Sequence, residues 1–208
     1  MSKLLALAVL SLLALVGCAS PTLTLPANPP LVLRIDPSFR PLRALTFPIE
    51  TFTDVDRRVF VHADDRRTIL RLAIVQFERV QPGSSFRFAF PPRPPAQFGA
   101  HTYRFGAYAN DDEAEAAKSP GKEAARTRAL LLAEGYKVPK VFRVARLARV
   151  GDRDGMTEVI IFYMEGADAE FPMRPLPMAD EDGDMPLGDA EARSILLRLK
   201  AAITPISG

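Results

Sequence analysis

Short stretches of apolar, β-branched and aromatic residues, bounded by prolines, glycines and aspartates, recur along most of this chain. Such stretches predict β-strands. Residues 69–77 are almost continuously apolar, which predicts a central strand buried on both faces, with a helix as the alternative that this run leaves open. Residues 152–155 read Asp-Arg-Asp-Gly between two apolar runs, which predicts a β-hairpin. The predicted strands are residues 31–35, 58–62, 68–80, 86–90 (with Phe86, Phe88 and Phe90 on one face), 101–109, 141–150 and 157–165.

Three helices are predicted from capping residues and apolar spacing. The first begins at Asn110 with acidic residues in its first turn, and the second begins at Ser119-Pro120 and stops at Gly135. The third begins at Asp189. The predicted fold class is therefore α+β, an antiparallel sheet covered by a few helices, with a C-terminal amphipathic helix. The predicted apolar faces are Ala125, Ala129, Leu132, Ala133 and Tyr136 in the second helix, and Ala192, Ile195, Leu196, Leu199 and Ile203 in the third.

Composition sets the class of protein. The chain has 208 residues, which suits one modest domain, and 19 prolines, which disfavours a helical bundle. Lysines and arginines number 27 against 25 acidic residues, a balance that excludes a dedicated nucleic-acid binder. We therefore expect no nucleic acid among its partners.

The first twenty residues carry a targeting signal. Lys3 precedes an uncharged apolar run, Leu4 to Val16, which is too short to span a bilayer and suits the central region of a signal peptide. The next residues, Leu15-Val16-Gly17-Cys18, resemble the lipobox of bacterial lipoproteins. That resemblance implies cleavage before Cys18, diacylglycerol on its sulfur, and a further acyl chain such as palmitate on the new amino terminus.

The resemblance also implies a domain organisation and a location. Residues 1–17 are expected to be the signal peptide, residues 18–30 a lipidated cysteine with a proline-rich tether, and residues 31–208 one globular domain. Residue 19 is Ala and not the Asp that retains lipoproteins in the inner membrane of enteric bacteria. The expected location is thus the outer membrane, with the domain facing the periplasm. Cys18 is the only cysteine, so no thiol is left for catalysis or metal binding.

An acidic stretch near the C-terminus resembles the calcium loop of EF-hand and dockerin proteins. Its twelve residues place Asp180, Asp182 and Asp184 at the first three ligand positions and Glu191 at the bidentate position, with Pro186 offering a carbonyl. The resemblance implies weak calcium binding, because Met185 replaces the glycine of the sharp turn. A solvated acidic loop is the alternative.

The sequence holds little that predicts catalysis. His62 and His101 lie in separate predicted strands without metal-ligand spacing, and no serine sits in a G-x-S-x-G motif. We therefore expect no enzymatic activity. A hydrolase of envelope polymers is the alternative, and it requires a cleft in which His62 or His101 meets Ser, Asp or Glu.

Three arginines, Arg143, Arg146 and Arg149, recur within one predicted strand, where their side chains would alternate between faces. A solvated sheet face is the simplest interpretation, and an anionic envelope lipid or glycan is the alternative partner. The expected function is a lipid-anchored binding or scaffolding protein of the cell envelope. Its partners would be the membrane, through the anchor, and an unidentified envelope protein, glycan or lipid; a calcium-dependent binding module is a further alternative.

Overall fold

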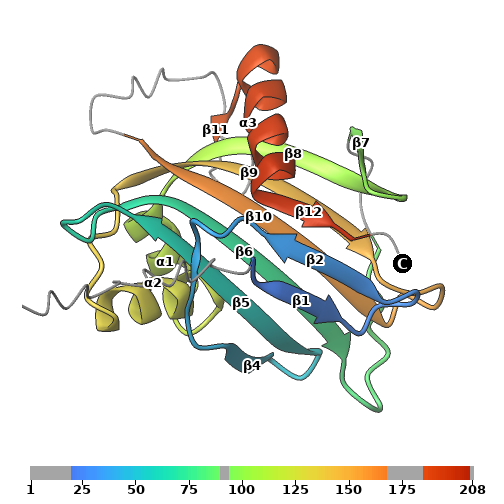
Figure 1. The fold of residues 1–208 in the computed structure, drawn as a ribbon. Coiled ribbons are helices and arrows are strands. Elements are labelled where there is room, and N and C mark those ends of the chain that lie inside the picture. Colours follow the sequence, from blue (N-terminus) through green and yellow to red (C-terminus); the bar gives the residue numbers. More distant parts are fainter. Residues whose placement is uncertain (1–19, 90–93, 168–184, 207–208) are drawn as a thin grey trace, which may run out of the picture.

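The computed structural model describes residues 20–89, 94–167 and 185–206, which are arranged mostly as antiparallel sheet with three helices (Figure 1). Within these residues a nine-stranded sheet has the order β11-β8-β9-β10-β6-β5-β3, with β4 also paired to β5 and β7 to β8. Its strands are β3 Arg40–Pro41, β4 Leu45–Ile49, β5 Thr53–Ala63, β6 Ile69–Val80, β7 Pro95–Phe98, β8 His101–Asp111, β9 Val141–Val150, β10 Thr157–Ala167 and β11 Met185–Pro186.

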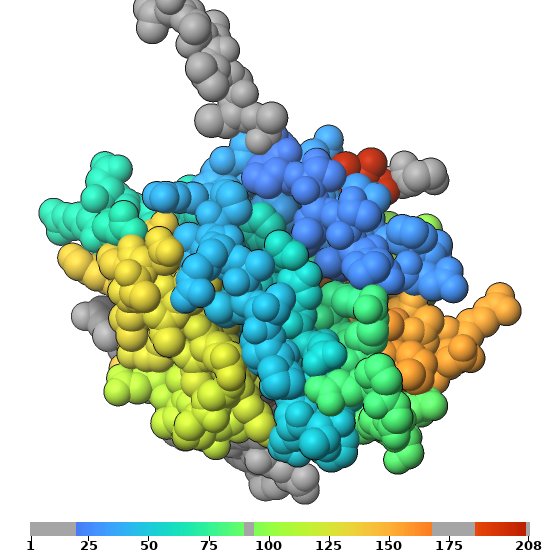
Figure 2. All heavy atoms as spheres, turned by 90° about the horizontal axis from the view of Figure 1, so that it is seen from below, coloured from blue at the N-terminus to red at the C-terminus, as the bar shows by residue number. Residues whose placement is uncertain are grey.

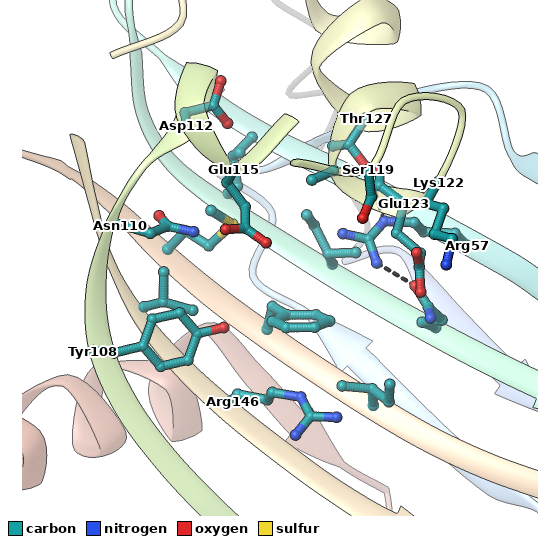
Figure 3. A pocket seen from close by; sticks show the side chains of 18 of the residues that line it. Arg57, Tyr108, Asn110, Asp112, Glu115, Ser119, Lys122, Glu123, Thr127 and Arg146 are labelled. Carbon is teal, nitrogen blue, oxygen red and sulfur yellow. Dashed lines mark hydrogen bonds between the residues drawn. The ribbon is translucent and has the colours of Figure 1, made fainter. Parts of the chain in front are cut away.

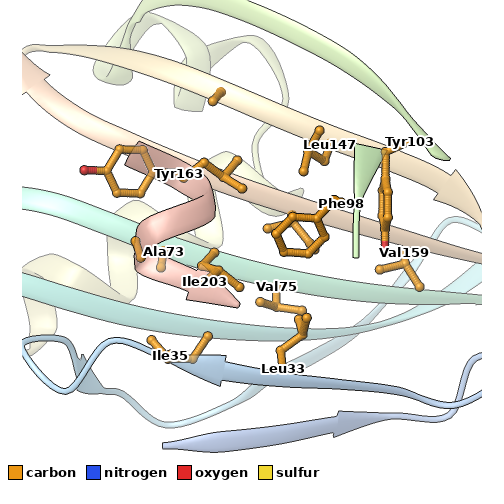
Figure 4. Close-up of a cluster of buried hydrophobic side chains, with 14 of the residues drawn as sticks. Leu33, Ile35, Ala73, Val75, Phe98, Tyr103, Leu147, Val159, Tyr163 and Ile203 are labelled. Atoms are coloured by element: carbon orange, nitrogen blue, oxygen red, sulfur yellow. The ribbon is translucent and has the colours of Figure 1, made fainter. Parts of the chain in front are cut away.

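One face of this sheet is covered by a smaller sheet and one helix. The smaller sheet has the order β1-β2-β12, formed by β1 Thr22–Leu25, β2 Leu31–Ile35 and β12 Ile203–Pro205. Helix α3, Asp189–Ala202, leads directly into β12. Side chains from both sheets and α3 form the largest core, including Leu33, Ile35, Val75, Leu147, Tyr163 and Ile203 (Figure 4).

The opposite face carries helices α1, Asp112–Lys118, and α2, Glu123–Ala133. Leu130 and Leu131 of α2 are buried against Ile74 and Val144 of the sheet, in a second, smaller core. From below, the segment containing α2 (yellow) lies directly beside the segment of β4 and its turn into β5 (blue to cyan) (Figure 2). The molecule therefore has three layers, with the large sheet in the middle.

The strand predictions for the centre of the sheet are confirmed. Residues 69–80 form β6, which lies between β10 and β5 and is buried along most of its length, so the helix alternative is wrong. The predicted hairpin joins β9 and β10, which pair from Glu158↔Val150 to Ala167↔Val141. A long apolar strand occupies the middle of this sheet because both its faces are covered.

The tether prediction for residues 18–30 requires correction. Thr22–Leu25 form β1, which pairs with β2, and Leu25 and Ala27 are buried in the largest core. The Asn28 amide also donates to the Gly151 carbonyl at 2.9 Å. The folded domain therefore begins before residue 31, because two apolar side chains between the prolines add to the core.

Residues 86–90 were expected to be a strand, and the described part of this segment is not one. Phe86 and Phe88 lie in irregular chain, with ring centroids 5.1 Å apart and edge to face, and Phe90 falls outside the described residues. The Phe88 amide bonds to the Gly155 carbonyl of the β9–β10 turn. The rings thus pack on each other at the end of the sheet.

Two of the predicted helix caps are shifted by one residue, and the cap of α2 is Lys122, three residues after the predicted Ser119. Asp111 caps α1, accepting hydrogen bonds from the Glu113 and Ala114 amides, in place of Asn110. Gly188 precedes α3 in place of Asp189.

In α2 the predicted apolar face is also wrong, although Tyr136, just beyond the helix, is buried as predicted. The residues that the helix buries are Thr127, Leu130 and Leu131, whereas Leu132 is 50% exposed. The helix begins at Glu123 because Gly121, with φ 82°, turns the chain first. Its end before Gly135, with φ 76°, is as predicted.

Candidate functional site

A cavity of about 700 Å³ lies between the large sheet and helices α1 and α2 (Figure 3). Strands β5, β6, β10, β9 and β8 form its floor, and α1, α2 and the turn between them form its other wall. Charged and polar groups occur on both sides. The polar residues of the lining are Arg57, Gln76, Tyr108, Asn110, Asp112, Glu115, Lys118, Ser119, Lys122, Glu123, Thr127 and Arg146, and the apolar ones are Leu72, Ile74, Ala124, Val144, Ile160, Phe162 and Met164.

The register of the strands sets the floor. Gln76 lies opposite both Arg57 and Ile160, and the next row places Phe162 between Ile74 and Arg146. Because alternate residues of a strand share a face, these side chains all point toward the helices. The floor is thus an apolar surface with a polar band across it.

Arg57 connects this floor to α2. Its side chain is buried, its Nε donates to Thr127 Oγ1 at 2.9 Å, and its Nη1 donates to Gln76 Oε1. Gln76 Nε2 in turn donates to Glu78 Oε1 at 2.6 Å. Burial lowers the pKa of Arg57 to about 10, which leaves the guanidinium charged at neutral pH. Arg57 therefore joins the sheet to the helix by hydrogen bonds.

Two buried carboxylates extend the polar band. Glu78 of β6 and Glu158 of β10 lie opposite each other in the sheet, and both side chains are almost fully buried from solvent. Thr53 Oγ1 donates to Glu78 Oε2 at 3.1 Å, whereas Glu158 Oε1 has no hydrogen bond in the described part of the chain. Burial, and then repulsion by Glu78, raise the pKa of Glu158 to about 7. Burial likewise raises the pKa of Glu78.

Phe162 is flanked by two guanidinium groups. The Arg57 and Arg146 carbons Cζ lie 5.2 and 5.9 Å from the centre of its ring. Arg146 Nη2 lies 3.7 Å from Glu158 Oε1, which is an ion pair beyond hydrogen-bond distance. The Arg146 side chain remains 27% exposed, and it is one of the groups that line the cavity.

Most charged groups on the helix side are already paired. Asp112 binds Arg128, and Glu115 Oε2 lies 2.8 Å from Lys118 Nζ. Lys122 Nζ lies 3.1 Å from Glu50 Oε1, which fixes the turn before α2 to the β4–β5 turn. Burial raises the pKa of Asp112.

Asn110 presents an unpaired acceptor to the same cavity. Its side-chain oxygen Oδ1 is buried, and no described residue donates a hydrogen bond to it. A buried acceptor without a donor is costly in a native protein. A bound molecule or water would satisfy it.

The histidines lie elsewhere. His62 Nδ1 is 3.1 Å from the Ser38 carbonyl oxygen, and its ring centroid is 5.9 Å from that of Phe39. His101 begins β8 and pairs with Phe98, so β6, β10 and β9 separate it from the strand of His62. Neither histidine lines the cavity.

The calcium-loop hypothesis is not tested, because three of its carboxylate ligands fall on residues that the structure does not describe. Asp180, Asp182 and Asp184 lie outside the described residues, whereas Glu191 lies in α3 with its Oε1 3.4 Å from Arg143 Nη1. Within the described residues, no group of three or more acidic, histidine or cysteine side chains could hold a metal ion. The calcium loop stays a prediction.

The alternation of the three arginines in β9 is confirmed. Arg146 faces the cavity, whereas Arg143 lies within 3.8 Å of Glu165 near α3, and Arg149 Nε donates to Tyr103 Oη. Sequence reasoning named Arg146 but missed Arg57, Glu78 and Glu158. The sequence carried no clear signal for their burial, because each has a polar neighbour in its own strand.

Comparison with known proteins gives no further assignment: no family model, curated protein or solved structure matches the chain. Cys18 precedes the described residues. No helix in the described part of the chain has the length and apolar character needed to cross a membrane.

Proposed function

We propose that this protein is a lipid-anchored component of the cell envelope that binds a small molecule in the cavity beneath α1 and α2. The lipobox residues, Leu15 to Cys18, support anchoring at the outer membrane, with the domain facing the periplasm. We assign the fold to the α+β class, with sheet as its dominant part. Binding without chemical conversion is the activity we propose.

The size and the lining of the cavity support binding of a small molecule. Its volume of about 700 Å³ falls within the range typical of small-molecule sites. Such sites combine an apolar lining with a few polar groups that orient the ligand, and here Arg146 and Asn110 are the polar groups with unused bonding capacity. A small domain rarely keeps a cavity of this size beside buried charges without a use for it.

Native mass spectrometry of the protein extracted from envelopes tests the proposal. We expect the wild type to carry an additional small-molecule mass, and Ala124→Trp, which fills the cavity from α2, to lose it. Ala129→Trp is the matched control, because Ala129 is an exposed residue of the same helix. Equal ligand loading of both variants would contradict binding in this cavity.

A further inference from the structure

We infer that the cavity recognises an amphipathic anion, a molecule with an apolar body and a carboxylate or phosphate head that binds Arg146. This inference rests on the proposed function and adds the chemical class of the ligand. The apolar body would lie on the floor around Phe162, and the head would bind the exposed edge of the Arg146 guanidinium.

The guanidinium of Arg146 has unused hydrogen-bond donors at the edge of the cavity. A guanidinium has five N–H donors, and in the described part of the chain none of those of Arg146 makes a hydrogen bond. Its nearest acid, Glu158, lies 3.7 Å away. Arg57, in contrast, already donates to Thr127 and Gln76. An arginine at the edge of a cavity with unused donors is suited to a planar or tetrahedral oxyanion, which it can bind through two parallel bonds.

The surrounding charges favour an anion over a cation. Of the carboxylates on the helix side, Asp112 is bound by Arg128 and Glu115 by Lys118. The negative charge of Glu123 acts on Arg57 and raises its pKa, although burial of Arg57 lowers the same pKa by more. Among the cations that line the cavity, Arg146 is the one whose N–H donors make no hydrogen bond in the described part of the chain, so it can bind an anion directly.

The floor supplies the apolar contact. Residues from β6, β9 and β10 form one continuous surface, on which Phe162 and Arg146 are cross-strand neighbours. Covering such a surface with hydrocarbon removes apolar area from water, which favours binding. The apolar residues of this surface are Leu72, Ile74, Val144, Ile160, Phe162 and Met164.

Binding of an anion at Arg146 is coupled to protonation of the Glu158 carboxylate. Its Oε1 is buried without a hydrogen bond, and it faces Glu78 of β6, Arg146 of β9, Arg104 of β8 and Glu123 of α2. When an anion occupies Arg146, the ionised form of Glu158 loses its nearest counter-charge and gains a like charge. Protonation of Glu158 then accompanies binding, so affinity for the anion falls as the pH rises through neutrality.

Titrations with four probes of equal chain length test the head group: decanoate, decyl phosphate, decanol and decyltrimethylammonium. Wild-type protein is expected to bind decanoate or decyl phosphate about tenfold more tightly than decanol, and the cationic probe most weakly. The tighter of the two anions identifies the head group. In Arg146→Met the anionic preference should disappear, while decanol affinity stays within about twofold.

Arg149→Met is the matched control, because Arg149 lies in the same strand and faces the opposite side of the sheet. It should keep the anionic preference. A second measurement does not depend on the folding of the arginine variants: decanoate affinity of the wild type should fall about fivefold or more from pH 6 to pH 8, and stay flat in Glu158→Gln.

The outcomes distinguish an error in the chemical class of the ligand from an error in the location of the binding site. If decanol binds the wild type as tightly as both anions, or if Arg146→Met keeps the anionic preference, the inference is overturned while the cavity remains a binding site. If no probe binds and Ala124→Trp changes no ligand loading, both the inference and the proposed function are wrong.

Discussion

Glu78 and Glu158 lie directly opposite each other on β6 and β10, and both side chains are buried beside the cavity. Two like charges at a cross-strand pair repel, and burial adds the cost of desolvation. Hydrogen bonds from Gln76 and Thr53 support Glu78, whereas Glu158 Oε1 receives none from the described residues. Glu78 therefore holds its negative charge more readily than Glu158, and Glu158 is the carboxylate that accepts a proton near neutral pH.

This relationship predicts a specific dependence of stability on pH. The pKa of Glu158 is raised from 4.5 to about 7 in the folded protein, so the folded state binds more protons than the unfolded state between these values. Stability should consequently fall as the pH rises across this window, by about 3 kcal/mol in total. Glu158→Gln should flatten this part of the profile in chemical denaturation from pH 5 to pH 8. Glu113→Gln, whose side chain is 79% exposed, should leave it unchanged; parallel profiles for the wild type and Glu158→Gln would refute the assignment.

Arg57 should stabilise the protein far more than its neighbour Arg58. Removing the charge and hydrogen bonds in Arg57→Met leaves Gln76 and Thr127 without their partner, and we expect a loss of about 3 kcal/mol in the free energy of unfolding. Arg58→Met removes only an ion pair to Asp56 whose partners are 40% and 37% exposed, which is worth less than about 1 kcal/mol. Urea denaturation of both variants measures the difference. Equal losses would contradict the described role of Arg57.

The segment before β2 should contribute to stability as part of the core. Leu25 is 2% exposed, so Leu25→Ala is expected to lower the free energy of unfolding by about 3 kcal/mol. Leu132→Ala is the matched control, because Leu132 is 50% exposed, and it should change stability by less than about 0.5 kcal/mol. If Leu25→Ala were as neutral as the control, the segment would be a tether after all.

Lipid attachment is a separate prediction. Metabolic labelling with a fatty acid should mark the wild-type protein in envelopes, because Cys18 follows a lipobox. Cys18→Ala should abolish the label while the domain, when expressed without residues 1–17, keeps its melting temperature. Persistent labelling of Cys18→Ala would show that the lipid is attached elsewhere, and an unlabelled wild type would show that the lipobox is not processed.

The sequence predicts the elements with strong periodicity and misses those set by tertiary contacts. The long strands β6, β9 and β10 and the helix α3 are predictable, because their apolar patterns are long and their turns distinctive. Strand β1 is not, since four residues among prolines carry no pattern of their own and become a strand only by pairing with β2. The buried face of α2 depends on how the helix packs on the sheet, which propensity does not encode.

The cavity could be predicted only in part. Arg146 was singled out by the spacing of arginines in β9, but its pairing with Glu158 depends on the register between β9 and β10. Arg57 and Glu78 come together through a second register, that of β5 on β6. A single sequence gives each strand, but a shift of one residue in either pairing would place these side chains on opposite faces.

Hydrogen exchange of the wild-type protein with and without decanoate tests the central claim most directly, because it locates the ligand. We predict slower exchange confined to the amides around the cavity, in residues 112–127 and in the parts of β9 and β10 near Arg146 and Phe162, and no such change in Ala124→Trp. Protection confined to β1, β2 and α3, which cover the other face of the sheet, or to the amides around Phe86 and Phe88, would contradict this prediction and place ligand binding outside this cavity.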